Sequence, residues 1–598
     1  MSLPSRDEVP VDEKWDPSLV FDSPQDWQAA ADAFADRIDD LRAYEGRAVE
    51  DGETLLELLD LVAELKVRRL GSLHLYAFLT SYVDTTDQAA RERMARYRDL
   101  RAEMESALGF LVPELRAAGV ERIQALLAST PELERHEAHL DRLLSGAEHA
   151  LDRETESVLA DLEPTVESGS DIARAITNGD VEAPTVETAD GERTVTPRVK
   201  SALLRSRDRA VRRETHQRFR DALGRHRHGM AAAFVERVRA DCRLAEVRGY
   251  DSALAMRLSG GDASLGGPFP PEAYETVIDG IADRLGPHHD LLDARREGTD
   301  GDDLREWDRH APLAPGEPPE IPYGEATTLI LDSLAPLGDE YVDRLAGLLA
   351  ERRIDVRETA NKRRGPKAIH ISSVEDGPFL ALNYDGSLRA LYLFTHELGH
   401  AMNRVLAGER QHPVDQGVPE HTGEVPSFVH ETLLADHLAD VLDSANALHA
   451  QSVFLDKLPL YRAARGARFV HDLHGAVADG ADPGPDALDD RHRTVRSEFA
   501  SPLTLGDDAG TGWQEMDLSR DPYHAYLYGI GSVGALSAVR ALGTGDLPAA
   551  EYREMLGRGR SVRSNEAFQP TLDFTEAATV ERGITAYEKR VNRLLARL

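Results

Sequence analysis

The 598-residue sequence has one cysteine, few aromatic residues and no long hydrophobic run. The single cysteine, Cys242, excludes an internal disulfide framework and is typical of a reducing compartment. No stretch approaches the ~18 consecutive apolar residues that a transmembrane helix needs, so we expect no membrane partner. The first residues contain no apolar segment of the secretory type, and the expected location is therefore cytoplasmic.

Basic residues are scarce, since 70 Lys and Arg face 106 Asp and Glu and give a formal net charge of −36. Such a surface repels nucleic acid and anionic lipid, which argues against both as partners. The acidic excess is also typical of proteins that work in molar salt, where a Debye length of about 3 Å screens the self-repulsion. We therefore interpret the source as halophilic and expect folding and activity to depend on salt.

The length of the chain exceeds what one hydrophobic core usually organises, so two or more domains or lobes are expected. Stretches rich in Ala, Leu, Glu and Arg with helical spacing run from 25 to 144 and from 199 to 258. The segment APTVETADGERTVTPRV alternates β-branched residues around a polar turn and predicts a hairpin. We predict a helical region with this hairpin as a linker at 1–198, followed by a second domain at 199–598.

The strongest chemical signal is the motif HELGH, which is an HExxH pattern. His396 and His400 are four residues apart, so on a helix both imidazoles face one side and can bind one metal ion. Glu397 follows the first histidine and is placed to take a proton from a water molecule. Two short β-type runs within 367–386 precede this helix, so the expected fold is mostly α-helical with a small β-sheet beside the site.

A third metal ligand is expected downstream, because catalytic zinc commonly has three protein ligands and an open position for water. The stretch HTGEVPSFVHETLLADHLAD is a second helical segment that holds several candidates. Spacing does not choose among them, and the candidates are Glu424, Glu431, His421, His430 and His437. Glu431 could instead orient a ligand imidazole by accepting its N–H.

The sequence HELGH followed by EVPSFVHE resembles the oligoendopeptidase F family, relatives of thimet oligopeptidase. The similarity covers most of the chain and begins at EKWDPSLVFDSPQDWQAA. It implies one Zn²⁺ per chain held by His396, His400 and Glu424, with a supporting role for Glu431. It also implies a two-lobed helical body with a deep channel that admits oligopeptides. Together with the acidic composition, it suggests a halophilic archaeon as the source.

The same resemblance suggests where the substrate carbonyl is held. The family has tyrosines near its C-terminus, and the corresponding stretch here is LSRDPYHAYLYGIGSVGAL. Tyr526 and Tyr523 are three residues apart and share a helix face, so both are predicted catalytic residues. The family's upstream histidine has no aligned counterpart, although His524 is near. The substrate backbone is expected to pair with an edge strand formed by Phe379, Leu380, Ala381, Leu382, Asn383 and Tyr384.

The predicted function is a zinc-dependent endopeptidase that cuts internal peptide bonds, with Glu397 as general base. One alternative is a helical zinc carboxypeptidase or dipeptidase, which would need a pocket for a peptide terminus. Another is a peptide-binding protein without catalytic activity, which would have no need of Glu397.

Overall fold

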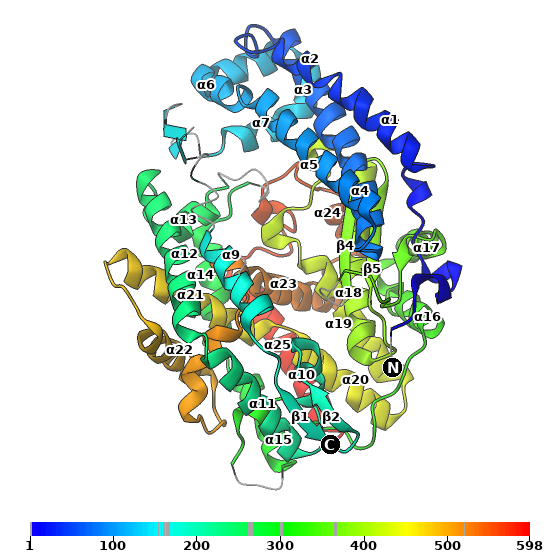
Figure 1. The fold of residues 1–598 in the computed structure, drawn as a ribbon, viewed down its shortest axis with the longest axis vertical. Coiled ribbons are helices and arrows are strands. Elements are labelled where there is room, and N and C mark those ends of the chain that lie inside the picture. Colours follow the sequence, from blue (N-terminus) through cyan, green and yellow to red (C-terminus); the bar gives the residue numbers. More distant parts are fainter. Residues whose placement is uncertain are drawn as a thin grey trace.

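The computed structural model describes residues 3–598, except 147–148, 153–154, 157, 160–161, 163–167, 261–266, 300–302, 364–367 and 519–520 and the side chains of 197 and 198. The fold is mostly α-helical with one two-stranded and one three-stranded sheet in this part of the chain, as predicted (Figure 1). Lys367, at the start of the first predicted β run, lies outside the described residues.

The N-terminal helices share a hydrophobic core of their own and lie together at one end of the molecule (Figure 1). Side chains such as Trp27, Leu59 and Leu100 are at most 1% exposed in this core. The helices of this lobe are α1 (Pro24–Ala35), α2 (Ile38–Arg42), α3 (Gly52–Val62), α4 (Leu70–Val83), α5 (Gln88–Leu108), α6 (Leu111–Ser129) and α7 (Glu137–Leu144).

A second and larger core extends from Ala173 to Leu594. The two cores therefore separate between Leu140 and Ala173, and the division at residue 198 stays a prediction. The helices of this second body are α9 (Ser168–Ala175), α10 (Pro197–Leu203), α11 (Arg209–Gly224), α12 (Arg227–Val247), α13 (Ala253–Leu258), α14 (Pro271–Ala282), α15 (Gly286–Glu297), α16 (Tyr323–Ser333), α17 (Asp339–Ala350), α18 (Leu388–Arg410), α19 (Val425–Val441), α20 (Ser444–Lys457), α21 (Leu460–Ala478), α22 (Pro485–Phe499), α23 (Ala525–Thr544), α24 (Ala549–Leu556) and α25 (Ala577–Leu595).

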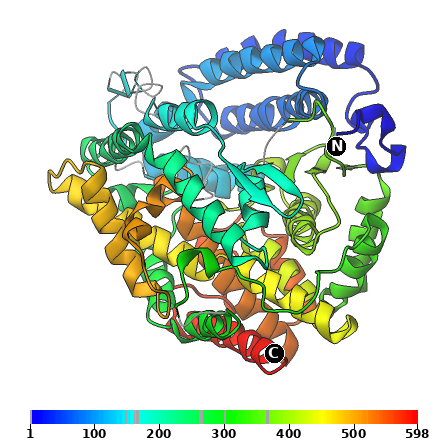
Figure 2. The ribbon, with the colours of Figure 1, turned by 60° about the horizontal axis from the view of Figure 1, so that its bottom comes forward.

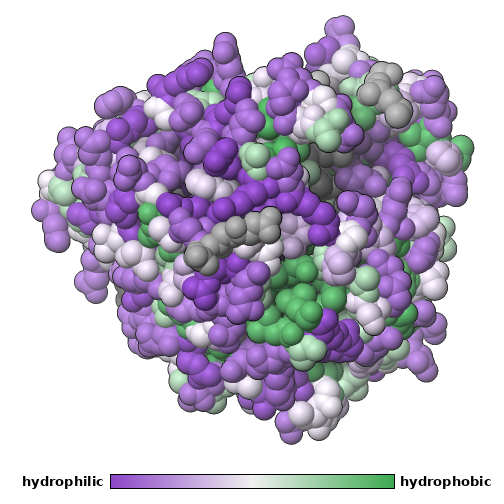
Figure 3. Space-filling model, turned by 90° about the horizontal axis from the view of Figure 1, so that it is seen from below, coloured by the Kyte–Doolittle hydropathy of each residue, from purple (hydrophilic) through white to green (hydrophobic). Residues whose placement is uncertain are grey.

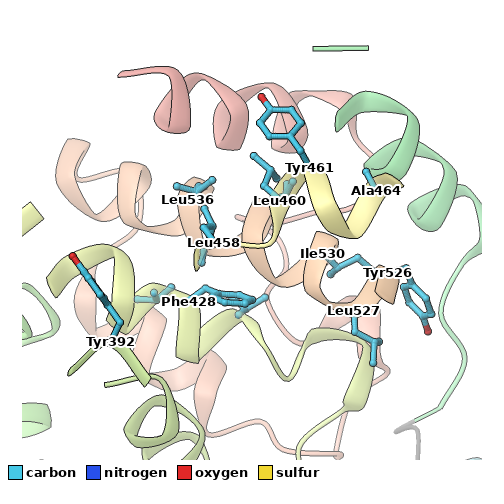
Figure 4. Packing of buried hydrophobic residues seen from close by; sticks show 14 of the residues in the cluster. Tyr392, Phe428, Leu458, Leu460, Tyr461, Ala464, Tyr526, Leu527, Ile530 and Leu536 are labelled. Carbon is cyan, nitrogen blue, oxygen red and sulfur yellow. The ribbon is translucent and has the colours of Figure 1, made fainter. Parts of the chain in front are cut away.

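Helix α23 lies at the centre of this body and packs against α19, α21 and α25 (Figures 1 and 2). Its side chains Ile530 and Leu536 join Phe428 of α19 and Leu460 of α21 in one apolar layer (Figure 4). In the described part of the chain, Pro522–Thr544 is the one segment long and apolar enough to cross a membrane. Because 78% of its apolar window is buried inside the protein, we assign α23 to the core.

The predicted hairpin is confirmed, since β1 (Thr185–Thr188) pairs antiparallel with β2 (Gly191–Thr194). A three-stranded sheet of order β3-β5-β4 lies against α18, and its strands are β3 (Ile354–Asp355), β4 (Ala368–Ser373) and β5 (Gly377–Leu382).

The prediction that Phe379–Tyr384 forms an edge strand is wrong. β5 contains Phe379–Leu382 and is the middle strand, with β4 antiparallel on one side and β3 parallel on the other. Leu380 and Ala381 have partners on both sides, so their backbone groups are already used within the sheet. Tyr384 donates its hydroxyl hydrogen bond to the Ile321 carbonyl, at 2.7 Å, and is also buried. β4 is therefore the long strand with a free edge among the described residues.

The surface agrees with the acidic composition. The face in Figure 3 is mostly hydrophilic, with its largest apolar patch just below the centre. Many exposed arginines lie one helical turn from a carboxylate, as in the pairs Arg101–Glu105 and Arg174–Asp171. Such pairs add little stability each and weaken with salt.

Candidate metal centre

Helix α18 presents the two histidines of HELGH on one face. The hydroxyl of Ser387 accepts the Ala390 N–H and caps its first turn, which fixes where the helix starts. Phe394 and Leu398 are fully buried and hold the opposite face against the core. His396 and His400 therefore project together, with ring centroids 4.9 Å apart.

Glu424 is brought to the two histidines by close packing of three helices. It stands immediately before α19, and α19 crosses α18 at Gly399, the glycine of HELGH. A Cβ at Gly399 would lie 2.5 Å from the Cα of Ser427, so only glycine permits this approach. On the other side, a Cβ at Gly531 of α23 would lie 2.5 Å from the Cβ of Glu424. Both glycines therefore fix the position of this carboxylate.

One candidate ligand atom from each of His396, His400 and Glu424 lies within 4.8 Å of the other two. The Glu424 Oε2 lies 3.3 Å from His396 Nε2, and Oε1 lies 3.8 Å from His400 Nε2. Oε2 is buried, and no described residue gives it a hydrogen bond. Burial alone would raise the pKa of Glu424, but the two imidazoles lower it to about 2. The donor set of two imidazole nitrogens and one carboxylate fits a catalytic zinc ion.

Glu431 contacts His396 through the ring nitrogen that does not face Glu424. Its Oε1 lies 2.7 Å from His396 Nδ1 and 2.5 Å from the ammonium of Lys457, and its side chain is fully buried. An acceptor at Nδ1 favours the imidazole tautomer that leaves Nε2 free to bind a metal. Burial opposes a charged imidazole, but Glu424 and Glu431 together raise the pKa of His396 to about 9. Lys457 was not identified from the sequence, because no local pattern connects it to the motif.

Glu397 shares the turn of α18 that carries the ligands. Burial, opposed by His396 and reinforced by the neighbouring Glu424, raises the pKa of its carboxyl to about 7. A carboxylate with a pKa near neutrality can both accept and return a proton at neutral pH.

The competing histidines of the second helical segment have other partners. His421 lies 2.6 Å from the hydroxyl of Tyr526 through Nδ1, and His430 lies 2.6 Å from the hydroxyl of Tyr341 through Nε2. Both are fully buried. Among the described residues, His437 belongs to no group of candidate metal ligands. The carboxylate of Glu424 is therefore the candidate that the fold brings to the HELGH histidines.

The structure does not bring Tyr526 or Tyr523 to this group. Tyr526 is fully buried with its hydroxyl on His421, and in Figure 4 its ring points away from Phe428, the residue that packs on His396. Tyr523 is 3% exposed, and its ring lies 4.4 Å from that of His474 in a tilted contact. Their predicted orientation toward the metal is contradicted by these contacts. The spacing of three residues did not predict where these side chains point, because α23 is buried on nearly all sides.

Tyr528 and His524 are better placed to reach the metal ligands. The Tyr528 ring lies 6.5 Å from Phe428, whose ring lies 5.1 Å from that of His396. The Tyr528 hydroxyl lies 3.3 Å from His524 Nε2, and both side chains are half-buried. His524 contributes to the lowered pKa of Glu424, which places it near the metal ligands.

A second set of candidate ligands consists of Asp60, His136 and His412, where the N-terminal lobe meets the segment after α18. Asp60 Oδ1 lies 2.9 Å from His136 Nε2, and Oδ2 lies 2.5 Å from the guanidinium of Arg135. An arginine on the carboxylate opposes a further cation. We therefore place the catalytic metal at the HELGH group.

A two-histidine, one-carboxylate metal group with an adjacent carboxylate base, inside a mostly helical body, is typical of a metallopeptidase. Residues 202–583 match the family model of peptidase family M3, and residues 114–182 match that of oligopeptidase F. The chain belongs to peptidase family M3, in its oligoendopeptidase F group, and is a metalloendopeptidase.

Relatives of known sequence and structure extend over the whole chain. Oligopeptidase PepF of Bacillus subtilis is 24% identical over 99% of this chain and 88% of its own length. Group B oligopeptidase PepB of Streptococcus agalactiae is 26% identical over 97% and 96%. The crystal structure of oligoendopeptidase F from Enterococcus faecium superposes with a TM-score of 0.71 at 20% identity, over 96% of this chain and 99% of that one. At this identity, the structural likeness supports the fold alone.

Proposed function

We propose that this protein is a zinc-dependent endopeptidase that hydrolyses internal peptide bonds of oligopeptides. The observation that carries the proposal is the convergence of His396, His400 and Glu424, with ligand atoms within 4.8 Å of one another and Glu397 on the same helical turn. When bound, Zn²⁺ would lower the pKa of water from about 15.7 towards about 7 and polarise the scissile carbonyl.

Glu397 performs the proton transfers. Its carboxylate accepts a proton from the attacking water, and the resulting carboxylic acid donates that proton to the nitrogen of the leaving amine. Glu431 accepts the N–H of His396 and keeps its ring in one orientation, while Lys457 balances the charge of Glu431. The proton thus moves from water to the amine product through one side chain.

Tyr528 is the proposed donor to the carbonyl oxygen as negative charge develops there, with His524 beside it. Tyr528→Phe should lower kcat by about 10²–10³-fold with a small change in KM, because the lost hydrogen bond is strongest in the transition state. Tyr526→Phe should change kcat little and instead lower the melting temperature, since it leaves buried His421 without its partner. Peptide kinetics and thermal unfolding of both variants measure this. The reverse pattern would return the role to Tyr526.

The substrate backbone is proposed to pair with the free edge of β4 rather than with β5. β4 lies against α18, and the ring of His370 on β4 lies 6.1 Å from that of His400. An extended peptide added to this edge would be held by main-chain hydrogen bonds, which require no particular side chains.

A peptide blocked at both ends and carrying a fluorophore and a quencher tests the proposed activity. The zinc-loaded protein should cleave it at an internal bond, identified by mass spectrometry of the products. The same peptide with free ends is the comparison. A carboxypeptidase or dipeptidase would leave the blocked peptide intact and release residues from the free one. A binding protein would retain both peptides uncut.

A further inference from the structure

A group of arginines without carboxylate partners lies beside the candidate metal centre. Its members are Arg389 in the first turn of α18 and Arg462 and Arg465, which are one turn apart near the start of α21. No described carboxylate lies within 4.0 Å of any of their guanidinium groups. In a chain of net charge −36, three neighbouring arginines without carboxylate partners are a local excess of positive charge.

The carboxylates in this region are already held by other cations. Asp456 Oδ1 lies 2.6 Å from Arg295, and Glu431 lies 2.5 Å from Lys457. Glu306 is bound by Arg496. Each negative charge thus has a partner of its own, and Arg389, Arg462 and Arg465 add net positive charge to the region.

Two connections link this group to the catalytic centre. Arg389 precedes the ligand His396 by seven residues, or about two turns of α18, so both lie on the same side of that helix. Arg462 interacts electrostatically with Tyr528, which packs through Phe428 onto His396. Arg389 and Arg462 are thus both connected to the elements that carry the metal ligands.

Two of these side chains, Arg389 and Arg465, are half-buried. Arg462 is exposed to solvent, yet burial, followed by the charges of Arg309 and Arg389, lowers its pKa to about 10. Burial likewise lowers the pKa of half-exposed Arg465. A side chain that solvent reaches while protein surrounds it stands in a concave site, where charges act more strongly than on a convex surface.

We propose that Arg389, Arg462 and Arg465 form a carboxylate-binding subsite, so that this enzyme prefers oligopeptides with a carboxylate near the scissile bond. The inference rests on the proposed endopeptidase function and names its substrate class. Guanidinium groups bind carboxylates through paired, charge-assisted hydrogen bonds, and an enclosed site strengthens them. The carboxylate can belong to an Asp or Glu side chain or to the C-terminus of a short peptide.

The test compares blocked fluorogenic peptides that carry Glu, Gln or Lys at one position at a time around the scissile bond. For the wild-type protein, kcat/KM should be about tenfold or more higher with Glu than with Gln at one or more positions, and lowest with Lys. A matched peptide pair with a free or an amidated C-terminus separates the two sources of the carboxylate. Equal kcat/KM across all these peptides would overturn the subsite.

The double variant Arg462→Gln/Arg465→Gln should lose the preference, measured as the ratio of kcat/KM for the Glu and Gln peptides within the same variant, so that any general loss of activity cancels. Arg468→Gln is the matched control, because Arg468 lies one turn further along α21 and pairs with Glu498 at 2.8 Å. It should retain the full preference, and a preference that persists in the double variant would exclude these arginines. Failure of wild type to cut the neutral peptide would contradict the endopeptidase proposal instead.

Discussion

Glu397→Gln is expected to lower kcat by about 10²–10⁴-fold while the zinc content stays at the wild-type level. The amide has the shape of the carboxylate but cannot accept the proton of the attacking water. Glu397 does not belong to the group of candidate metal ligands, so the ion should bind as before. The measurements are kcat with the blocked peptide and the metal content of the purified protein.

A control on the same helix separates this effect from a general loss of charge. Glu409 lies at the exposed end of α18 and pairs with Arg344 at 2.7 Å. Glu409→Gln should leave kcat within about twofold of wild type, because surface ion pairs contribute little. If Glu397→Gln kept most of its activity, another group would have to be the base. If it lost zinc in parallel, its role would be structural.

The metal-binding helix is the part of the site that the sequence predicts best. Two histidines four residues apart on a helix must face one side, whatever the rest of the fold does. The choice of Glu424 over its neighbours required the family resemblance, because the decisive contacts are between helices. They depend on the close approaches at Gly399 and Gly531, which no spacing within one helix reveals.

The incorrect predictions involve partners that are distant in sequence. β3 is only two residues long, Ile354–Asp355, and its parallel pairing with β5 turned the expected edge strand into a central one. Tyr526 was predicted as a catalytic residue because it is three residues from Tyr523. However, α23 is apolar on nearly every side, so its periodicity does not indicate which face is turned toward the metal. Tyr528 and Lys457 were recognisable only once neighbouring helices had been placed.

Glu424→Ala is expected to weaken zinc binding by more than about 100-fold, because it removes one of three proposed ligands. The loss should appear as a falling zinc content during dialysis and as the disappearance of zinc-dependent thermal stabilisation. At a zinc concentration 100 times Kd, that stabilisation is about 2.7 kcal/mol in the wild type.

Glu431→Gln provides the graded comparison, because Glu431 contacts His396 only through the ring nitrogen that faces away from the ion. Its metal affinity should fall by about 10–100-fold, between wild type and Glu424→Ala. A Glu424→Ala protein with a full zinc complement would move the third ligand to another residue and remove the basis for the hydrolytic site. Equal losses in both variants would instead mean that the orientation of His396, and not the number of ligands, limits how tightly the metal is held.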